Sequence, residues 1–185
     1  MILLARHGRT AYNDEGRFQG QGPVPLDAQG RAQAVELAGA VVARGDVDRI
    51  VSSPLTRALE TAAIVAAATG LAPEVEPRLA ETDCGTWADR TYAEVEAEDP
   101  DGYAAFRALE LDFAAPGGET FAAHLARSRA AIVAIRAADE LRAGAGGRPV
   151  TLVVCHRNVI RLLLRHERGE ERDHDELANA AVEEL

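Results

Sequence analysis

Short β-like runs alternate with longer helical runs along this chain, and the alternation constrains its fold more than any other feature. The apolar run Ile2 to Arg6 and the β-branched run "VTLVVC" at 150–155 both predict buried strands. "DRIVSS" at 48–53 predicts a further short strand, and "APEVEPRL" at 72–79 predicts a strand or an extended segment. Strands that alternate with helices favour a mostly parallel sheet with helices on both faces. We therefore predict a three-layer α/β/α sandwich.

Helical periodicity and capping residues predict four helices between and after these strands. Asp27 precedes a run with apolar residues at helical spacing, and Ser53 is the expected N-cap of the next helix, which ends before Gly70. A long helix is expected from Glu119 to about Arg142. "NVIRLLLRH" at 158–166 predicts the last helix, directly after the clearest strand.

The length and composition indicate one domain. A chain of 185 residues, of which 47% are apolar, has the size of a single compact domain with one core. Residues 82–118 are the least regular part, and we expect them to form a small cap over a site within the domain that spans 1–185. Trp87 falls in this stretch and is expected to be a packing anchor.

The charge and the cysteines narrow the class of partner and the compartment. A net charge of −10 argues against nucleic acid or an anionic membrane as partner, because both favour a basic protein face. The first apolar run stops at Arg6, far short of the roughly 20 apolar residues that cross a membrane, so we expect a cytoplasmic protein. Cys84 and Cys155 match no metal-ligand or redox spacing, so we expect reduced thiols.

Arginine and histidine follow the carboxyl ends of two predicted strands. Arg6 and His7 end the first apolar run, and His156 follows 150–155. Ligands of open α/β sheets bind outside the carboxyl ends of the strands, so these side chains are expected at one site. Arg57 lies in the first turn of a helix, where a cation opposes the helix dipole unless an anion is shared between them. The other histidines have no such context and are expected at the surface: His124, His166 and His174.

Several motifs occur in a fixed order along nearly the whole chain. They are "RHG" (6–8), "RFQG" (17–20), "PLDAQGRAQA" (25–34), "SSPLTRALETA" (52–62), "LAETDCGTW" (79–87) and "PGGET" (116–120). A histidine then follows the last long strand. In this order the sequence resembles the histidine phosphatase superfamily, in the branch that includes cofactor-dependent phosphoglycerate mutases and related small phosphatases. The resemblance implies a phosphoglycerate mutase-like fold.

The same resemblance implies the roles of the site residues. His7 would attack phosphorus and form a phosphohistidine, and Glu81 would give a proton to the leaving oxygen and later take one from water. Cations set against the phosphoryl oxygens, with one carboxyl acting first as acid and then as base, suit the hydrolysis of phosphate monoesters. No metal and no cofactor are implied. The residues expected to bind the phosphate are Arg6, Asn13, Gln19, Gly20, Arg57 and His156.

We therefore expect a metal-independent phosphatase that acts on small phosphorylated metabolites. The shortness of the chain favours this activity over a mutase, because the resemblance implies that mutases carry longer insertions over the site. A protein phosphohistidine is an alternative substrate, although the cap predicted at 82–118 favours a small molecule. The sequence leaves the oligomeric state open between a monomer and a homodimer.

Arg157 departs from the family pattern, which usually has glycine after the second histidine. We expect its side chain to bind the phosphate as a further ligand, with crowding of the site as the alternative. Asp89 also stands where the family commonly has glycine. If Arg157 prevents turnover, the protein would be a regulatory pseudo-phosphatase that binds phosphate without hydrolysing its esters.

A different phosphatase pattern lies in the same stretch of sequence. "CHRNVIR" has the spacing of a tyrosine-phosphatase-type loop, in which Cys155 would be the nucleophile and Arg161 the phosphate ligand. Such a loop closes its backbone amides tightly around phosphate and is usually helped by glycine, yet this interval holds none. Cys155 is better interpreted as the last buried residue of its strand.

Overall fold

A five-stranded sheet forms the middle layer of the computed structural model, which describes residues 1–143, 147, 149–173 and 176–185. Its strands are β1 (Ile2–Arg6), β2 (Val47–Ser52), β3 (Pro73–Val75), β4 (Val150–Cys155) and β5 (Val182–Glu184). They lie in the order β3-β2-β4-β1-β5, and every neighbouring pair is parallel except β1 with β5. The prediction of a mostly parallel sheet is confirmed.

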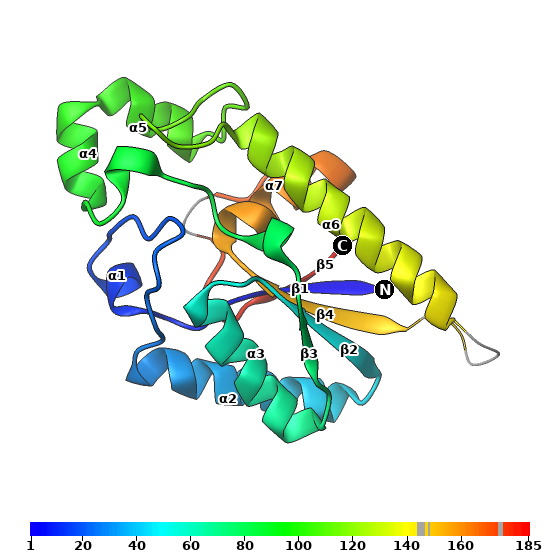
Figure 1. Cartoon of the computed structure of the whole chain (residues 1–185). Coiled ribbons are helices and arrows are strands. Elements are labelled where there is room, and N and C mark those ends of the chain that lie inside the picture. The colour runs from blue at the N-terminus through cyan, green and yellow to red at the C-terminus, as the bar shows by residue number, and fades with distance from the viewer. Residues whose placement is uncertain (144–146, 148, 174–175) are drawn as a thin grey trace.

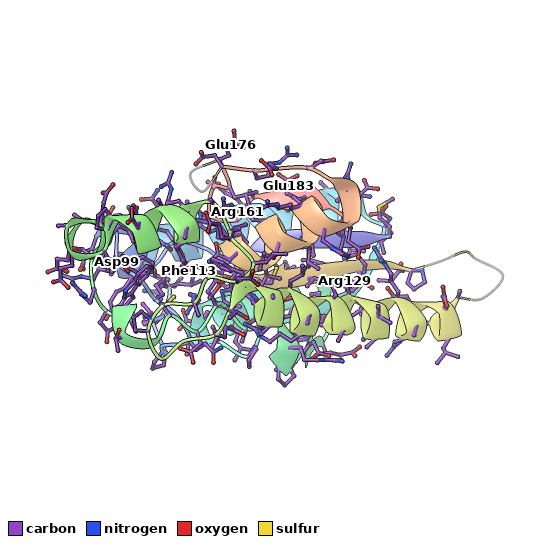
Figure 2. All side chains as sticks on the ribbon, turned by 90° about the horizontal axis from the view of Figure 1, so that it is seen from above. Asp99, Phe113, Arg129, Arg161, Glu176 and Glu183 are labelled. Carbon is purple, nitrogen blue, oxygen red and sulfur yellow. The ribbon has the colours of Figure 1, made fainter. Side chains whose placement is uncertain are left out.

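Long helices cover both faces of the sheet (Figure 1), with α2 (Ala28–Arg44) and α3 (Thr56–Thr69) on one face and α6 (Phe121–Arg142) and α7 (Arg157–Arg168) on the other. Along β1, Leu3 packs into the cluster with α2 and α3, while Leu4 packs into the cluster with α6 and α7. Seen from above in Figure 2, α6 and α7 lie side by side. None of the described helices combines the length and the apolar composition that a membrane crossing requires.

The helix starts show which capping predictions hold. The Asp27 carboxylate accepts a hydrogen bond from the Gly30 amide at 2.7 Å, as expected of the N-cap of α2. The prediction for α3 is wrong at its start, because the helix begins at Thr56 with Leu55 as N-cap and no side-chain cap. Ser53 Oγ lies instead 2.7 Å from His156 Nε2. The end of α3 at Gly70, which has a left-handed φ of 76°, is as predicted.

Residues 82–118 hold three short elements beyond the carboxyl ends of β1 and β4: η2 (Gly85–Trp87), α4 (Tyr92–Glu98) and α5 (Pro100–Arg107) (Figure 1). They share an apolar cluster with Phe18, whose ring centroid lies 5.2 Å from that of Trp87. Trp87 is buried, so its predicted role as a packing anchor is confirmed. Two further short elements are α1 (Ala11–Asp14) and η1 (Pro77–Leu79).

The C-terminal segment returns to the sheet as β5, a strand that the sequence pattern does not predict. Val182 pairs with Ala5 in the antiparallel register. Just before this strand, the Ala180 amide donates to the carbonyl oxygens of Arg6 and His7, at 3.1 and 3.3 Å. The segment therefore holds the backbone at the point where β1 ends and the site begins.

Candidate active site

A partly open cavity lies at the carboxyl ends of β1 and β4. His7 and Glu81 both line it, and so does Arg157. Tyr92 and Phe106, from α4 and α5, form part of its wall. With the exception of His156, every residue expected to bind phosphate lines it as well: Arg6, Asn13, Gln19, Gly20 and Arg57.

His7 presents one ring nitrogen to this cavity in a form that can attack. Its Nδ1 lies 2.7 Å from the Gly8 carbonyl oxygen, and a carbonyl only accepts, so Nδ1 carries the hydrogen and Nε2 keeps a lone pair. Arg57 Nε donates to that Nε2 at 3.3 Å. Burial lowers the pKa of His7 well below 6.5, and the neighbouring charges of Arg57 and Arg6 lower it further. The imidazole is therefore neutral near neutral pH, as a nucleophile must be.

Arg57 is held rigidly beside His7. It is the second residue of α3, is 1% exposed, and donates to the carbonyl oxygens of Gly20 at 2.9 Å and Gly22 at 3.2 Å. Burial lowers its pKa to about 10, so the guanidinium stays charged near neutral pH. Gly20 turns its carbonyl toward Arg57 through a left-handed φ of 47°, which glycine adopts readily.

Arg6 adds a second buried cation from the end of β1. Its Nη1 donates to the Leu177 carbonyl oxygen at 2.5 Å, and burial together with the charge of Arg157 lowers its pKa to about 9. Within the described part of the chain, no carboxylate forms a salt bridge with Arg6 or Arg57, and Arg6 Nε has no hydrogen-bond partner. The charge of Glu81 acts on both guanidinium groups without forming a salt bridge to either, so this buried pair still favours an incoming anion.

His156 lies behind His7. It is the N-cap of α7, and its ring centroid is 5.2 Å from that of His7. Its Nε2 is within 2.7 Å of Ser53 Oγ, and it is not among the residues that line the cavity. Burial, followed by the charges of Arg57 and His7, lowers its pKa well below 6.5. The structure thus brings His156 to the site, in contact with the His7 ring.

The first loop orients two amide side chains. Asn13 Oδ1 accepts from the Thr10 amide at 3.1 Å and from Asn179 Nδ2 at 3.2 Å, so its own NH2 group is left to donate into the cavity. Gln19 Oε1 lies 3.0 Å from Thr10 Oγ1. Asn179 also donates to the His7 carbonyl oxygen at 3.0 Å, which ties the C-terminal segment to both site residues. Asn179 belongs to none of the motifs above, so local sequence does not predict this role.

Glu81 is fixed by its backbone as well as by its side chain. Its carbonyl oxygen accepts from Gln21 Nε2 at 3.1 Å and from Arg127 Nη2 at 3.0 Å. Its Oε1 accepts from the Thr82 amide at 2.8 Å. The Asn158 amide lies 3.5 Å from Oε2. A carboxyl held on the same cavity as His7 is placed to exchange protons with a bound ester.

Arg157, the first residue of α7, makes the cavity more cationic than the family pattern would. Its charge lowers the pKa of Arg6, where only burial has a larger effect, and also contributes to the lowered pKa of His7. Three guanidinium groups therefore act on one cavity, and their field favours an anion that carries more than one charge.

Two further expectations concern histidines and the cysteine pattern. His124 is buried, so its expected surface position is wrong, whereas His166 is exposed and His174 lies outside the described residues.

Cys155 is the buried last residue of β4, and burial raises its pKa, so the thiol is a poor nucleophile. Arg161 donates to the carbonyl oxygens of Arg107 and Arg172, at 2.8 and 2.9 Å, beside α5 (Figure 2). Neither Cys155 nor Arg161 lines the cavity.

The chain is similar to known proteins in sequence and in fold. A sequence model described as the histidine phosphatase superfamily, branch 1, matches residues 2–185. A bifunctional protein of Mycobacterium tuberculosis is 37% identical over 164 residues, which cover 89% of this chain and 43% of that protein. A glucosyl-3-phosphoglycerate phosphatase of the same species is 38% identical over 154 residues, covering 82% of this chain and 68% of the relative. The native structure of a mycobacterial glucosyl-3-phosphoglycerate phosphatase has a TM-score of 0.83 at 31% identity, covering 98% of this chain and 87% of that chain.

Proposed function

The chain belongs to the histidine phosphatase superfamily, branch 1, and we propose that it hydrolyses phosphate monoesters of small metabolites through a phosphohistidine at His7. The observation that carries the proposal is the neutral His7 ring, whose Nε2 faces Arg57 on a cavity that also holds Arg6. The glucosyl-3-phosphoglycerate phosphatase among the relatives supports a small phosphorylated metabolite as substrate. The chain spans 43% of the length of the bifunctional relative.

In the first step, His7 Nε2 attacks phosphorus and the bond to the ester oxygen breaks. The hydrogen bond from Arg57 Nε to Nε2 must first move to a phosphoryl oxygen, which frees the lone pair as the substrate binds. Arg6 and Arg57 then balance the charge on the phosphoryl oxygens. Glu81, in its protonated form, gives its proton to the leaving oxygen.

In the second step, water attacks the phosphohistidine and the N–P bond breaks. Glu81, now ionised, takes a proton from the attacking water and returns to its acid form. His7 recovers its lone pair while Nδ1 keeps its hydrogen bond to the Gly8 carbonyl oxygen. Phosphate leaves, and the site residues are restored without a metal ion or cofactor in any step.

The charge of the cavity supports a narrower substrate class. Arg6, Arg57 and Arg157 supply three positive charges, and a protonated Glu81 supplies none. A phosphate monoester dianion suits the buried guanidinium groups of Arg6 and Arg57, and the charge of Arg157 on the same cavity favours a further anionic group on the leaving part of the substrate. We propose that residues 82–118, whose Tyr92 and Phe106 line the cavity, act as the cap that contacts this leaving part.

A panel of phosphorylated metabolites, assayed for phosphate release with a metal chelator present, tests the proposal. We expect turnover by the natural chain and none by His7→Ala. Tight phosphate binding without turnover of any ester would instead support a pseudo-phosphatase. Interconversion of 2- and 3-phosphoglycerate that depends on a bisphosphoglycerate primer would show a mutase and contradict the proposal.

A further inference from the structure

Glu81 lies at one end of a buried chain of hydrogen bonds that reaches into α6. Thr82 Oγ1 is 3.3 Å from Glu81 Oε1, the oxygen that also accepts from the Thr82 amide. The same hydroxyl is 2.8 Å from His124 Nδ1 and 3.2 Å from Asn158 Nδ2. Thr82, His124 and Asn158 are all buried. One hydroxyl therefore connects the acid to a histidine that the mechanism above does not use.

The hydrogens in this chain can be assigned by counting donors and acceptors. A hydroxyl has one hydrogen and two lone pairs, and the Asn158 NH2 group can only donate to one of the lone pairs. An ionised Glu81 can only accept, so the hydroxyl hydrogen reaches it when His124 donates from Nδ1 to the second lone pair. The Thr82 hydroxyl then donates one hydrogen bond, to Glu81, and accepts two, from Asn158 and His124.

The opposite tautomer of His124 would leave a hydrogen without an acceptor. In that form Nε2 carries the hydrogen, and Nε2 is buried with no partner among the described residues. An orphaned buried N–H is less favourable than a bare lone pair. Burial, with a smaller contribution from Arg127, also lowers the pKa of His124 well below 6.5, so the ring is neutral and has one hydrogen to place. Nδ1 is the better position for it.

We infer that His124 and Thr82 are positioning residues for Glu81, which together hold its Oε1. Oε2, which lies 3.5 Å from the Asn158 backbone amide, then carries the proton that is transferred in the cavity. The inference rests on the proposed function, because it gives Glu81 the role of acid and base. Both hydrogen bonds to Oε1 favour the ionised carboxylate. Removing either bond therefore disfavours the carboxylate relative to the protonated acid.

Other titratable and charged groups surround Glu81, and they stay the same when Thr82 or His124 is substituted. They include His7 on the same cavity, Asp83 and Cys84 of its own loop, and Glu119, which pairs with Arg127. The others are Arg6 of β1, Arg57 of α3, Tyr92 of α4, Arg127 of α6, Cys155 of β4, and Arg157 and Arg161 of α7. His156 of β4's end faces His124. Differences between variants in one pH profile therefore report the hydrogen-bond chain.

Matched substitutions separate the hydrogen bonds from the packing. Thr82→Val removes the hydroxyl at nearly constant shape, and Thr82→Ser keeps it. His124→Leu removes the Nδ1 donor, whereas His124→Asn retains a side-chain N–H donor in the same region. Ser128→Ala is the control, because Ser128 is buried one turn along α6 and its Oγ has no partner in the described residues. Thermal unfolding of each variant checks that it is folded.

The readout is the rate of phosphoenzyme formation in a single turnover. An alkyl phosphate needs a proton on its leaving oxygen, whereas 2,4-dinitrophenyl phosphate does not. On the plateau below the basic limb, where Glu81 carries its proton in every variant, we expect Thr82→Val to slow the alkyl ester about tenfold, the effect of one hydrogen bond to a charged group, with little change for the dinitrophenyl ester. The basic limb of its kcat/KM profile should move up by about one pH unit. His124→Leu should move the basic limb in the same direction by a smaller amount. The basic limbs of Thr82→Ser and His124→Asn should lie close to that of the natural chain.

Three results would overturn the inference. One is a Thr82→Val profile that matches Ser128→Ala, and another is an equal loss with both esters. The third is a basic limb that stays in place or moves to lower pH in His124→Leu, since a move downward means that the natural ring holds the hydroxyl hydrogen away from Glu81. A natural chain that forms no phosphoenzyme with either ester refutes the proposed function instead, so the two failures are distinguishable.

Discussion

Acid should destabilise this fold through histidines that are buried in their neutral form. His7, His124 and His156 are each buried, and burial is the largest cause that lowers each pKa well below the ordinary 6.5. In the unfolded chain the same side chains take up protons as the pH falls through about 6.5. Below that pH the unfolded state binds more protons than the folded state, so stability decreases as the pH falls.

The magnitude follows from the number of groups. One pH unit below 6.5, each neutral buried histidine reduces the free energy of unfolding by about 1.4 kcal/mol, and the three together by about 4 kcal/mol. That is a large part of the roughly 5–15 kcal/mol by which native proteins are stable. Carboxylates affect stability at a lower pH. Arginine partners hold the pKa values of Glu74 and Glu167 below 4.5, so these residues stabilise the fold above that pH and lose this effect only below it.

Urea unfolding followed by circular dichroism at about pH 7.5 and about pH 5.5 measures this loss. His124→Asn should remove about a third of the difference between the two pH values, whatever it does to stability at either one. His166→Asn, at an exposed position of α7, should leave the difference unchanged. Equal stability at the two pH values would refute the reasoning, as would an effect of His166→Asn as large as that of His124→Asn.

Three substitutions test how the phosphate is held. Arg57→Leu should lower kcat/KM about 10²- to 10⁴-fold by removing two charge-assisted hydrogen bonds of about 1.5–3 kcal/mol each, and a loss of under tenfold would place the phosphate elsewhere. Arg157→Gly should lower kcat/KM about tenfold for esters whose leaving group carries a carboxylate and leave uncharged leaving groups nearly unaffected, in contrast to a uniform effect on both. Asn179→Ala should raise KM about tenfold by releasing Asn13, as measured with the best metabolite of the panel, and an unchanged KM would contradict that link.

The strands that could be predicted are those whose side chains are buried on both faces of the sheet. β1 and β4 are buried throughout, which a continuous run of apolar, β-branched residues indicates without knowledge of the partner strands. β5 was not predictable, because its three residues include two glutamates and pair only along the edge of β1. The N-cap at Asp27 was predictable because the capping hydrogen bond is local. The Ser53 side chain contacts the buried His156, which is distant in the sequence, so its position was not predictable.

The site divides in the same way. Strand ends and motif order pointed to Arg6, His7 and Arg57, which line one cavity as expected. The burial of His124 depends on how α6 packs against the segment that holds Thr82, and no local pattern reports that packing. Residues that line the cavity could therefore be predicted from local sequence, whereas residues that support them depend on tertiary contacts and could not.

Identifying the phosphorylated residue tests the central claim most directly. The natural chain, quenched during turnover of its best ester and mapped by mass spectrometry, should carry phosphate on His7, in a bond that survives alkali and is lost in acid. The same adduct should form in Cys155→Ser and be missing in His7→Ala. Phosphate on Cys155, or steady turnover in His7→Ala, would contradict the account.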